Sequence, residues 1–410
     1  MNFKLFRLIH NERPYKRYYY EPLFDKRGEV KRFAFFFELK QYAIIFMRAV
    51  YLPFNNKYNV RQFPGERKSK VTMLWENVLW AFKYKEVNTY YFLYGLDLKG
   101  RNPKDYVAYT EFRVLRNILN FRQRENLRTK YTFNYLALTR DKFVFYQYCK
   151  SLNFPYPKLI ALVSNGQISW CNDNRLDFED LAVISKKNFK AFCKEINGES
   201  GIGAFVLEIN NGDIFIQGKK ATLNDIKRRL AKATFLIQEK LNNHPDIENI
   251  YSKSLNTLKL ITILNQNGEV EFFDSVIRFG ANGSFVDNAS QGGIFVGISE
   301  DGYLQEVGYH EPGIKSNLIV NGIHPDTGKR FGGMKLPYWD ELLAEAKRFH
   351  KFFYGVPSIG WDVAITPDGF VFTETGEDWE IPLYQVTNGG KRKEFYRTHG
   401  QALKIKLRKY

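Results

Sequence analysis

The stretch Ile359-Gly-Trp-Asp-Val-Ala-Ile-Thr-Pro-Asp-Gly-Phe-Val-Phe-Thr-Glu374 contains two runs of β-forming residues around a turn, and it predicts a β-hairpin. If Pro367-Asp-Gly forms a three-residue loop, the register places Asp362 opposite Glu374. Two facing carboxylates repel each other unless a cation lies between them. Oxygen ligands of this kind suit Mg²⁺ held together with substrate phosphates. A solvated acidic pair is the alternative interpretation.

Further hairpins and helices surround this stretch. Asn211-Gly212 is a strong hairpin signal between β-forming runs, and a second hairpin is predicted over 258–279 around Asn267-Gly268. Helical spacing predicts helices over 71–80 and 106–120, and an amphipathic helix over 338–353. Thr139-Arg-Asp predicts the start of a further helix, with Thr139 as its cap and Asp141 in its first turn. Because strands and helices intermix without a regular strand–helix–strand alternation, the pattern predicts an α+β fold rather than a doubly wound sheet.

The composition is that of a globular protein of two to three domains. The chain has 410 residues, of which 44% are hydrophobic and 26% charged, so disorder of the whole chain is excluded. It contains no apolar run of about 18 residues, the length that a membrane-spanning helix needs. The three cysteines show no CxxC spacing, which argues against a zinc site and a disulfide framework and favours a cytoplasmic location.

The formal charge of +17 is unevenly distributed. Residues 1–150 hold 30 Lys and Arg against 13 Asp and Glu, and residues 391–410 hold 8 against 1. The two basic ends predict a surface for a polyanion such as anionic lipid or an acidic glycan. A solvated basic face is the alternative. Nucleic acid is disfavoured as a partner, because no recognisable nucleic-acid-binding module is present.

Two glycine-rich segments are candidates for function. Gly198, Gly201 and Gly203 lie between two predicted strands, where exposed backbone N–H groups can surround phosphate oxygens. Lys194, just upstream, is a natural phosphate partner, although the glycines taken alone favour a plain hairpin with a flexible tip. The segment 278–293 is too polar and glycine-rich for a core and has the length of a functional loop.

Five segments, in this order, resemble the sugar-transfer-associated ATP-grasp family, relatives of ATP-dependent carboxylate–amine ligases found with polysaccharide-assembly enzymes. They are Phe235-Leu-Ile-Gln-Glu-Lys-Leu-Asn-Asn-His-Pro, Asn256-Thr-Leu-Lys-Leu-Ile-Thr, Val276-Ile-Arg-Phe-Gly, Val286-Asp-Asn with Gly292-Gly-Ile, and Ile359-Gly-Trp-Asp-Val-Ala-Ile-Thr. The resemblance extends over roughly residues 135–390 and leaves residues 1–130 uncovered.

The resemblance implies an ATP-grasp fold, in which two α+β subdomains clasp ATP. We expect a basic, aromatic-rich and largely helical N-terminal domain over residues 1–130. The two ATP-grasp subdomains are then expected over 131–235 and 236–390, followed by a basic tail over 391–410. ATP and Mg²⁺ are the cofactors that the family implies.

The resemblance also implies a role for individual residues. The residues expected beside the ATP phosphates are Lys142, Lys194, Gly198, Gly201 and Gly203, and those expected at the adenine are Gln238 and Glu239. The residues expected in catalysis are Arg278, Lys259 and Asn256, with Arg278 facing the γ-phosphate or acyl-phosphate. The residues expected to hold Mg²⁺ are Asp362 and Glu374.

The chain departs from the family pattern at three positions. Glu374-Thr-Gly376 lacks the Asn of the usual Glu-x-Asn, Lys259 stands where Arg is common, and Glu195 follows Lys194 where Pro is usual. Because of the first departure, a protein with weakened activity, or one that only binds nucleotide, is an open alternative.

The expected activity is ATP-dependent amide formation through an acyl-phosphate. The expected substrates are an amino acid or amine and a sugar acid or glycan of cell-surface polysaccharide, such as a capsule. A sugar kinase and a catalytically silent nucleotide-binding partner of a glycosyltransferase are the alternatives. The expected location is the cytoplasm, with attachment to the inner face of the membrane as an open extension.

Overall fold

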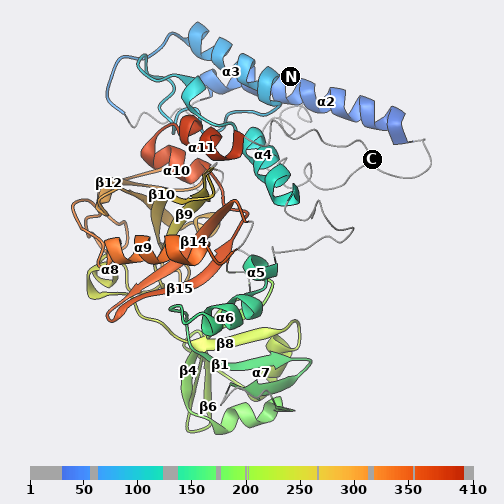
Figure 1. The fold of residues 1–410 in the computed structure, drawn as a ribbon, viewed down its shortest axis with the longest axis vertical. Coiled ribbons are helices and arrows are strands. Elements are labelled where there is room, and N and C mark those ends of the chain that lie inside the picture. The colour runs from blue at the N-terminus through green and yellow to red at the C-terminus, as the bar shows by residue number, and fades with distance from the viewer. Residues whose placement is uncertain are drawn as a thin grey trace. The chain divides into compact units, whose positions relative to one another are not determined.

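The computed structural model describes residues 30–55, 63–122, 137–171, 177–198, 201, 203–265, 267–312, 318–353 and 356–400 (Figure 1). The chain divides into two compact units. One draws on Met1–Asn117, Pro312–Ile319 and Ile381–Tyr410, and the other on Ile118–Glu311 and Val320–Glu380. The boundaries expected at residues 130, 235 and 390 remain predictions.

The first unit is helical in its described residues, as the sequence predicts. Its helices are α2 (Val30–Tyr51), α3 (Lys70–Tyr84), the start of α4 (Tyr109–Arg122), α10 (Pro382–Asn388) and α11 (Arg392–His399). The helix α3 begins at a Ser69 cap, whose side chain accepts a hydrogen bond from the Thr72 N–H, and ends at Lys85 in the left-handed conformation. Among the described helices, none combines the length and apolar character that crossing a bilayer requires.

The C-terminal helices belong to this first unit. The Gln385 side chain accepts a hydrogen bond from the Val107 N–H at 2.7 Å and donates one to the Val107 carbonyl at 3.0 Å. Arg392 pairs with Glu111 at 2.7 Å and donates to the Tyr106 carbonyl. The stretch expected as a basic tail therefore begins with an anchored helix, and residues 401–410 lie outside the described residues.

The second unit contains two sheets, and every described strand pair with a defined register is antiparallel. The first is eight-stranded, in the order β3-β2-β1-β8-β4-β5-β6-β7. Its elements are β1 (Leu159–Ser164), β2 (Gln167–Trp170), β3 (Phe178–Asp180), β4 (Phe189–Glu195), β5 (Phe205–Asn210), β6 (Asp213–Ile216), β7 (Lys219–Ala221) and β8 (Phe235–Glu239), together with helix α7 (Leu223–Leu230).

The second sheet is seven-stranded, in the order β13-β12-β11-β10-β9-β14-β15. Its elements are β9 (Thr257–Leu264), β10 (Val270–Phe279), β11 (Ile294–Ile298), β12 (Leu304–Tyr309), β13 (Ile319–Asn321), β14 (Ser358–Thr366) and β15 (Gly369–Gly376), with helices α8 (Pro245–Ile250) and α9 (Trp339–His350). Leu342, Ala346 and Phe349 of α9 are buried in the core of this sheet, which confirms the amphipathic helix expected there.

The hairpin β14–β15 forms with a shorter turn than the sequence predicts. Thr366 pairs with Gly369, so the turn has two central residues, Pro367 and Asp368, rather than three. A bulge at Thr373 then inserts one extra residue into β15. The two departures cancel, and Asp362 lies opposite Glu374 as expected.

Helices α5 (Ala137–Arg140) and α6 (Lys142–Ser151) precede the first sheet. The cap of α6 is Asp141, whose carboxylate accepts hydrogen bonds from the Phe143 and Val144 N–H groups. The sequence predicts a Thr139 cap instead, but the Thr139 hydroxyl donates to buried Glu377 at 2.7 Å. The Thr139 hydroxyl therefore donates to a carboxylate that is distant in sequence instead of capping the helix.

Candidate functional site

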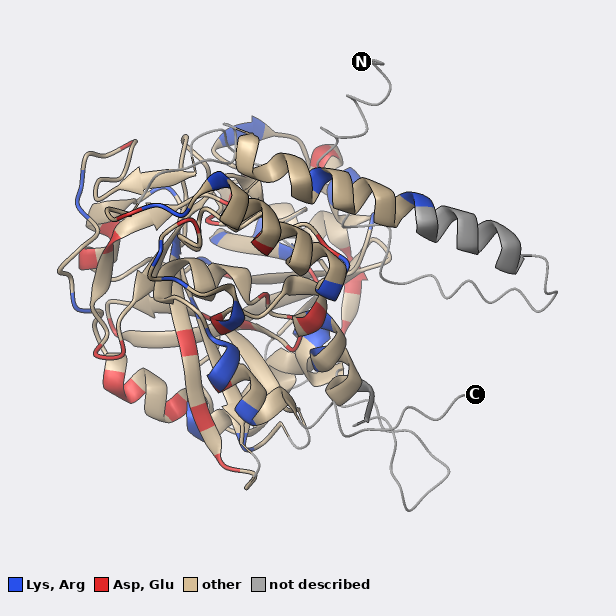
Figure 2. Ribbon diagram, turned by 90° about the horizontal axis from the view of Figure 1, so that it is seen from above, with Lys and Arg blue, Asp and Glu red and all other residues tan. Residues whose placement is uncertain are grey.

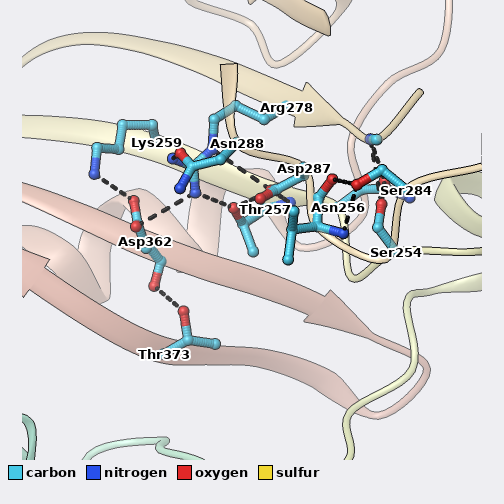
Figure 3. A network of polar contacts seen from close by, with 12 residues as sticks. Ser254, Asn256, Thr257, Lys259, Arg278, Ser284, Asp287, Asn288, Asp362 and Thr373 are labelled. Carbon is cyan, nitrogen blue, oxygen red and sulfur yellow. Dashed lines mark hydrogen bonds and ion pairs between the residues drawn. The ribbon is translucent and has the colours of Figure 1, made fainter. Parts of the chain in front are cut away.

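Three charged residues stand in one row across the second sheet. Asp362 of β14 lies directly opposite Lys259 of β9 on one side and Glu374 of β15 on the other. The Lys259 Nζ is 2.8 Å from Asp362 Oδ1, and Arg278 Nη2 of β10 is 3.4 Å from Asp362 Oδ2 (Figure 3). The antiparallel register of four adjacent strands therefore gathers these side chains.

The Asp362 carboxylate is ionised and neutralised by the protein itself. Burial alone raises its pKa, but Lys259 and Arg278 more than offset that effect and hold the pKa below its usual value. The sequence predicts repulsion between Asp362 and Glu374 in the absence of a bound cation. In the structure, side-chain cations fill that role.

Arg278 is the centre of a second group of contacts. Its Nη2 donates to the Thr257 hydroxyl at 2.6 Å and its Nη1 to Asn288 Oδ1 at 3.2 Å, while Nε lies 3.5 Å from Asp287 Oδ2. Asp287 also accepts a hydrogen bond from the Thr257 N–H. Burial raises the pKa of Asp287, against the opposing effect of Arg278. These contacts fix the guanidinium beside Asp362, as Figure 3 shows.

Two lysines that lie outside the second sheet contact strand β15 of the β14–β15 pair. Lys142 begins α6; its Nζ is 2.9 Å from Glu374 Oε1 and donates to the Gly198 carbonyl at 2.5 Å. Lys194 of β4 donates to the Thr373 carbonyl at 3.0 Å. Burial lowers the pKa of Lys194 to about 8; Lys142 acts in the same direction, while Glu374 and Asp362 oppose it. Lys194 can therefore change its charge near neutral pH.

The glycine loop lies next to the second glycine-rich segment. Gly201 and Gly203 have φ values of +69° and +81°, which favour glycine. A Cβ added at Gly201 would lie within 4 Å of Val286, Asn288 and Gln291. The two segments that the sequence singles out, around 198–203 and 278–293, thus meet at the site.

The other predicted residues are held by internal contacts. Gln238 is buried in β8, and the Glu239 carboxylate accepts a hydrogen bond from the Lys158 N–H at 2.7 Å. The Asn256 side chain is buried; it donates to Asn243 Oδ1 and the Tyr251 carbonyl and accepts from Ser254 and the Gly280 N–H. Asn256 therefore orders the loop before β9. Its catalytic role, like the adenine contacts of β8, remains a prediction.

Sequence reasoning assigns no role to several residues that complete the site. Thr257, Asp287 and Asn288 lie in segments that carry the family resemblance, so that resemblance is a signal for them. Glu377 is fully buried and accepts hydrogen bonds from Thr139 and from Arg140 Nε, the latter at 2.6 Å. Neither local spacing nor a motif connects residues so far apart in the chain.

The donor set fits a polyphosphate with a hard cation. The cationic side chains Lys142, Lys194, Lys259 and Arg278 surround Asp362 and Glu374, whose carboxylate oxygens are the ligands that Mg²⁺ prefers. Within the described residues, no group of three or more His, Cys, Asp or Glu side chains is arranged to hold a metal. Two carboxylates together with substrate phosphates are sufficient for Mg²⁺.

The sequence profile of the sugar-transfer associated ATP-grasp family matches residues 121–395. A comparison with curated proteins gives no significant match.

Several solved structures match the chain at low sequence identity. N5-carboxyaminoimidazole synthetase from Staphylococcus aureus, complexed with ADP, is 12% identical with a TM-score of 0.38, over 68% of this chain and 57% of that one. D-alanyl-alanine synthetase A from Vibrio cholerae is 11% identical with a TM-score of 0.37, over 66% of each chain. L-amino acid ligase from Bacillus licheniformis is 10% identical with a TM-score of 0.34, over 65% and 45%. This chain spans about half of the length of the first solved enzymes that it matches.

Proposed function

The chain belongs to the sugar-transfer associated ATP-grasp family and has the ATP-grasp fold, and we propose that it is an ADP-forming carboxylate–amine ligase. The proposed substrates are a sugar acid or glycan, which supplies the carboxylate, and an amino acid or other amine. This assignment places the reaction in the assembly of a cell-surface polysaccharide.

One observation supports this proposal above the others. Four cationic side chains approach the Asp362–Glu374 pair. They are Lys142 of α6, Lys194 of β4 in the first sheet, and Lys259 of β9 and Arg278 of β10 in the second sheet. A cationic cluster of this kind suits the triphosphate of ATP, and it stabilises the charge that develops on a transferring phosphoryl group. Asp362 and Glu374 would hold Mg²⁺, which would neutralise phosphate charge when bound.

The chemistry proceeds in two steps. The substrate carboxylate attacks the γ-phosphorus of ATP, so that an acyl-phosphate forms and ADP leaves. The amine then attacks the acyl carbon, phosphate leaves, and the amine loses a proton as the amide forms. Arg278, fixed by Thr257 and Asn288, is the residue that we assign to the transferring phosphoryl group or the acyl-phosphate.

The proposal is tested by measuring ADP release against a panel of uronic acids and amino acids. A ligase releases ADP only when both a carboxylate and an amine are present. ADP release with a sugar hydroxyl alone would favour a kinase, and ATP binding without ADP release under any combination would favour a silent nucleotide-binding partner. Either result would refute the ligase assignment.

The departure at Gly376 has a direct test. Its φ is not positive. A Cβ there would lie 2.8 Å from Asp378 Oδ1, at the end of a side chain that can turn away, and 4.0 Å from the Asp378 backbone nitrogen. Gly376→Asn restores the amide of the family pattern, so we expect it to lower the Mg²⁺ concentration needed for ADP release. An unchanged Mg²⁺ requirement would show that this position does not limit the metal site.

A further inference from the structure

Helix α3 in the first unit is apolar on two opposite sides. One side is buried within the unit through Met73, Trp80 and Ala81. The other side carries a stripe with the spacing of one helix face, and these side chains are 61% to 85% exposed. They are Val71, Trp75, Leu79 and Phe82. A surface helix of a globular protein has a single apolar side facing its core, so the second side requires a partner.

The preceding segment extends this stripe. Tyr42 and Phe46 of α2 are 40% and 50% exposed, and Phe54 of the short helix η1 (Leu52–Phe54) is 49% exposed. The Lys85 Nζ lies 5.2 Å from the centroid of the Tyr42 ring, and the Lys70 Nζ lies 5.7 Å from that of Phe54. These contacts join the two segments into one surface with an ammonium group at each end. We call it the α2–α3 surface.

The α2–α3 surface is predominantly basic. Over residues 40–54 and 70–85 the basic side chains are Lys40, Arg48, Lys70, Lys83 and Lys85, and Glu76 is the one acidic residue. The Glu76 carboxylate is engaged by Lys68 at 2.8 Å and by the Tyr91 hydroxyl. In Figure 2 the described part of α2, the helix that continues into grey, carries blue and no red.

We propose that the α2–α3 surface binds an anionic membrane and lies in its headgroup layer. An exposed aliphatic and aromatic stripe that includes a tryptophan, bordered by lysines, is the composition of an interfacial helix.

The other occupants match the α2–α3 surface less well. An acidic glycan would pair with the lysines but would leave Val71 and Leu79 without an apolar partner. A second copy would bring lysines of both chains together at the rim of the interface, and like charges there oppose association. An anionic bilayer satisfies both the acyl contacts and the charges.

Co-sedimentation with lipid vesicles tests this proposal on the full chain. We expect binding to vesicles of phosphatidylcholine that contain phosphatidylglycerol, weak binding to phosphatidylcholine alone, and weakening by salt. The double variant Leu79→Ser/Phe82→Ser should lower the partition coefficient by about tenfold or more, because two apolar side chains no longer leave water. Lys83→Glu should lower it by about fivefold or more.

The matched control is Phe178→Ser in β3, which replaces a 44% exposed phenylalanine outside the α2–α3 surface. It should bind vesicles as the wild type does. All variants should keep the thermal stabilisation by MgATP, so that a failure here is distinct from a failure of the proposed ligase activity.

Fluorescence locates the contact. Lipids brominated in the acyl chain should quench part of the tryptophan emission of the wild type. The Trp75→Phe variant should still bind the vesicles, but its remaining emission should not be quenched. Equal quenching in Trp75→Phe, no binding to anionic vesicles, or binding unaffected by Leu79→Ser/Phe82→Ser would each overturn the proposal. Self-association that the double variant abolishes, without vesicle binding, would identify a second copy as the occupant instead.

Discussion

Asp362 and Glu374 face each other across β14 and β15, yet each carboxylate has its own cations. Lys259 and Arg278 pair with Asp362, while Lys142 pairs with Glu374. The two environments differ, because the Asp362 side chain is 13% exposed and that of Glu374 is 38% exposed. Replacing the carboxylate by its amide therefore has different consequences at the two positions.

Asp362→Asn should destabilise the protein without ligand. It removes the anion between two partly buried cations, and breaking such a pair costs about 3 kcal/mol. Glu374→Gln should change the free energy of unfolding by less than about 1 kcal/mol, because solvent screens the more exposed pair. Urea unfolding measures both. A stability gain in Asp362→Asn would show that repulsion from Glu374 outweighs the pairing with Lys259 and Arg278.

Lys142→Ala and Lys194→Ala should each weaken ATP binding. Each removes a charge-assisted hydrogen bond to phosphate, a loss of about 1–3 kcal/mol. Titration calorimetry with ATP and Mg²⁺ measures the effect, and Lys150→Ala at the exposed end of α6 is the matched control. Unchanged affinity in both site variants would refute their assignment to the phosphates.

ATP affinity should fall as the pH rises through about 8, because the pKa of Lys194 is lowered to that value by burial and the neutral amine binds phosphate poorly. Lys194→Arg stays charged and should flatten this dependence. Stability should respond with the opposite sign. The unfolded chain binds more protons than the folded one between pH 8 and the ordinary lysine value of 10.5, so the contribution of Lys194 to stability rises over that window.

Stability should fall in acid through His350. Trp361 Nε1 donates to the Thr262 hydroxyl at 2.8 Å, that hydroxyl donates to His350 Nδ1 at 2.7 Å, and His350 Nε2 donates to the Val356 carbonyl at 2.8 Å. This direction of donation requires a neutral ring, and burial lowers the pKa of His350 to about 4. The unfolded chain therefore binds more protons between pH 4 and 6.5.

Over that pH range the free energy of unfolding should drop by up to about 1.4 kcal/mol per pH unit through this group. Urea unfolding of the wild type and of His350→Gln at several pH values measures the slope. We expect a smaller slope in His350→Gln, and equal slopes would show that another group causes the acid sensitivity.

Gly293→Ala should disrupt the loop that supports Arg278. A Cβ at Gly293 would lie 2.2 Å from the Asp287 carbonyl oxygen, so the backbone must shift, and the contact between Asp287 and Thr257 shifts with it. We expect lower thermal stability and weaker ADP release. Gly100→Ala, where a Cβ meets nothing within 4 Å, is the matched control and should leave both unchanged.

Local signals predicted the strands well. The two hairpins predicted at Asn211-Gly212 and around Asn267-Gly268 both form. In the first, Asn210 pairs with Asp213 across a two-residue turn, whereas the second turns over a longer segment between Leu264 and Val270. The facing of Asp362 and Glu374 was predicted with a wrong turn length, and the Thr373 bulge compensated for it. A bulge has no signal in this sequence, so that compensation could not be foreseen.

The site was less predictable where partners are far apart in the chain. The sequence suggested a Thr139 cap because a hydroxyl before an acidic residue is a local capping pattern. In the structure the carboxylate of Glu377, a residue remote in sequence, accepts hydrogen bonds from that hydroxyl and from Arg140. Likewise, the cations that neutralise Asp362 follow from strand order, which local patterns do not specify.

The closure of the first unit by Gln385 and Arg392 has a consequence for synthesis on the ribosome. Residues 30–117 leave the ribosome before the second unit, but their partners Gln385 and Arg392 leave it only after that unit. Both sheets, complete by Gly376, are available for folding before then. The helical segment that precedes the two sheets is thus completed after them, and until then its apolar side chains need protection by chaperones or early contact with a surface.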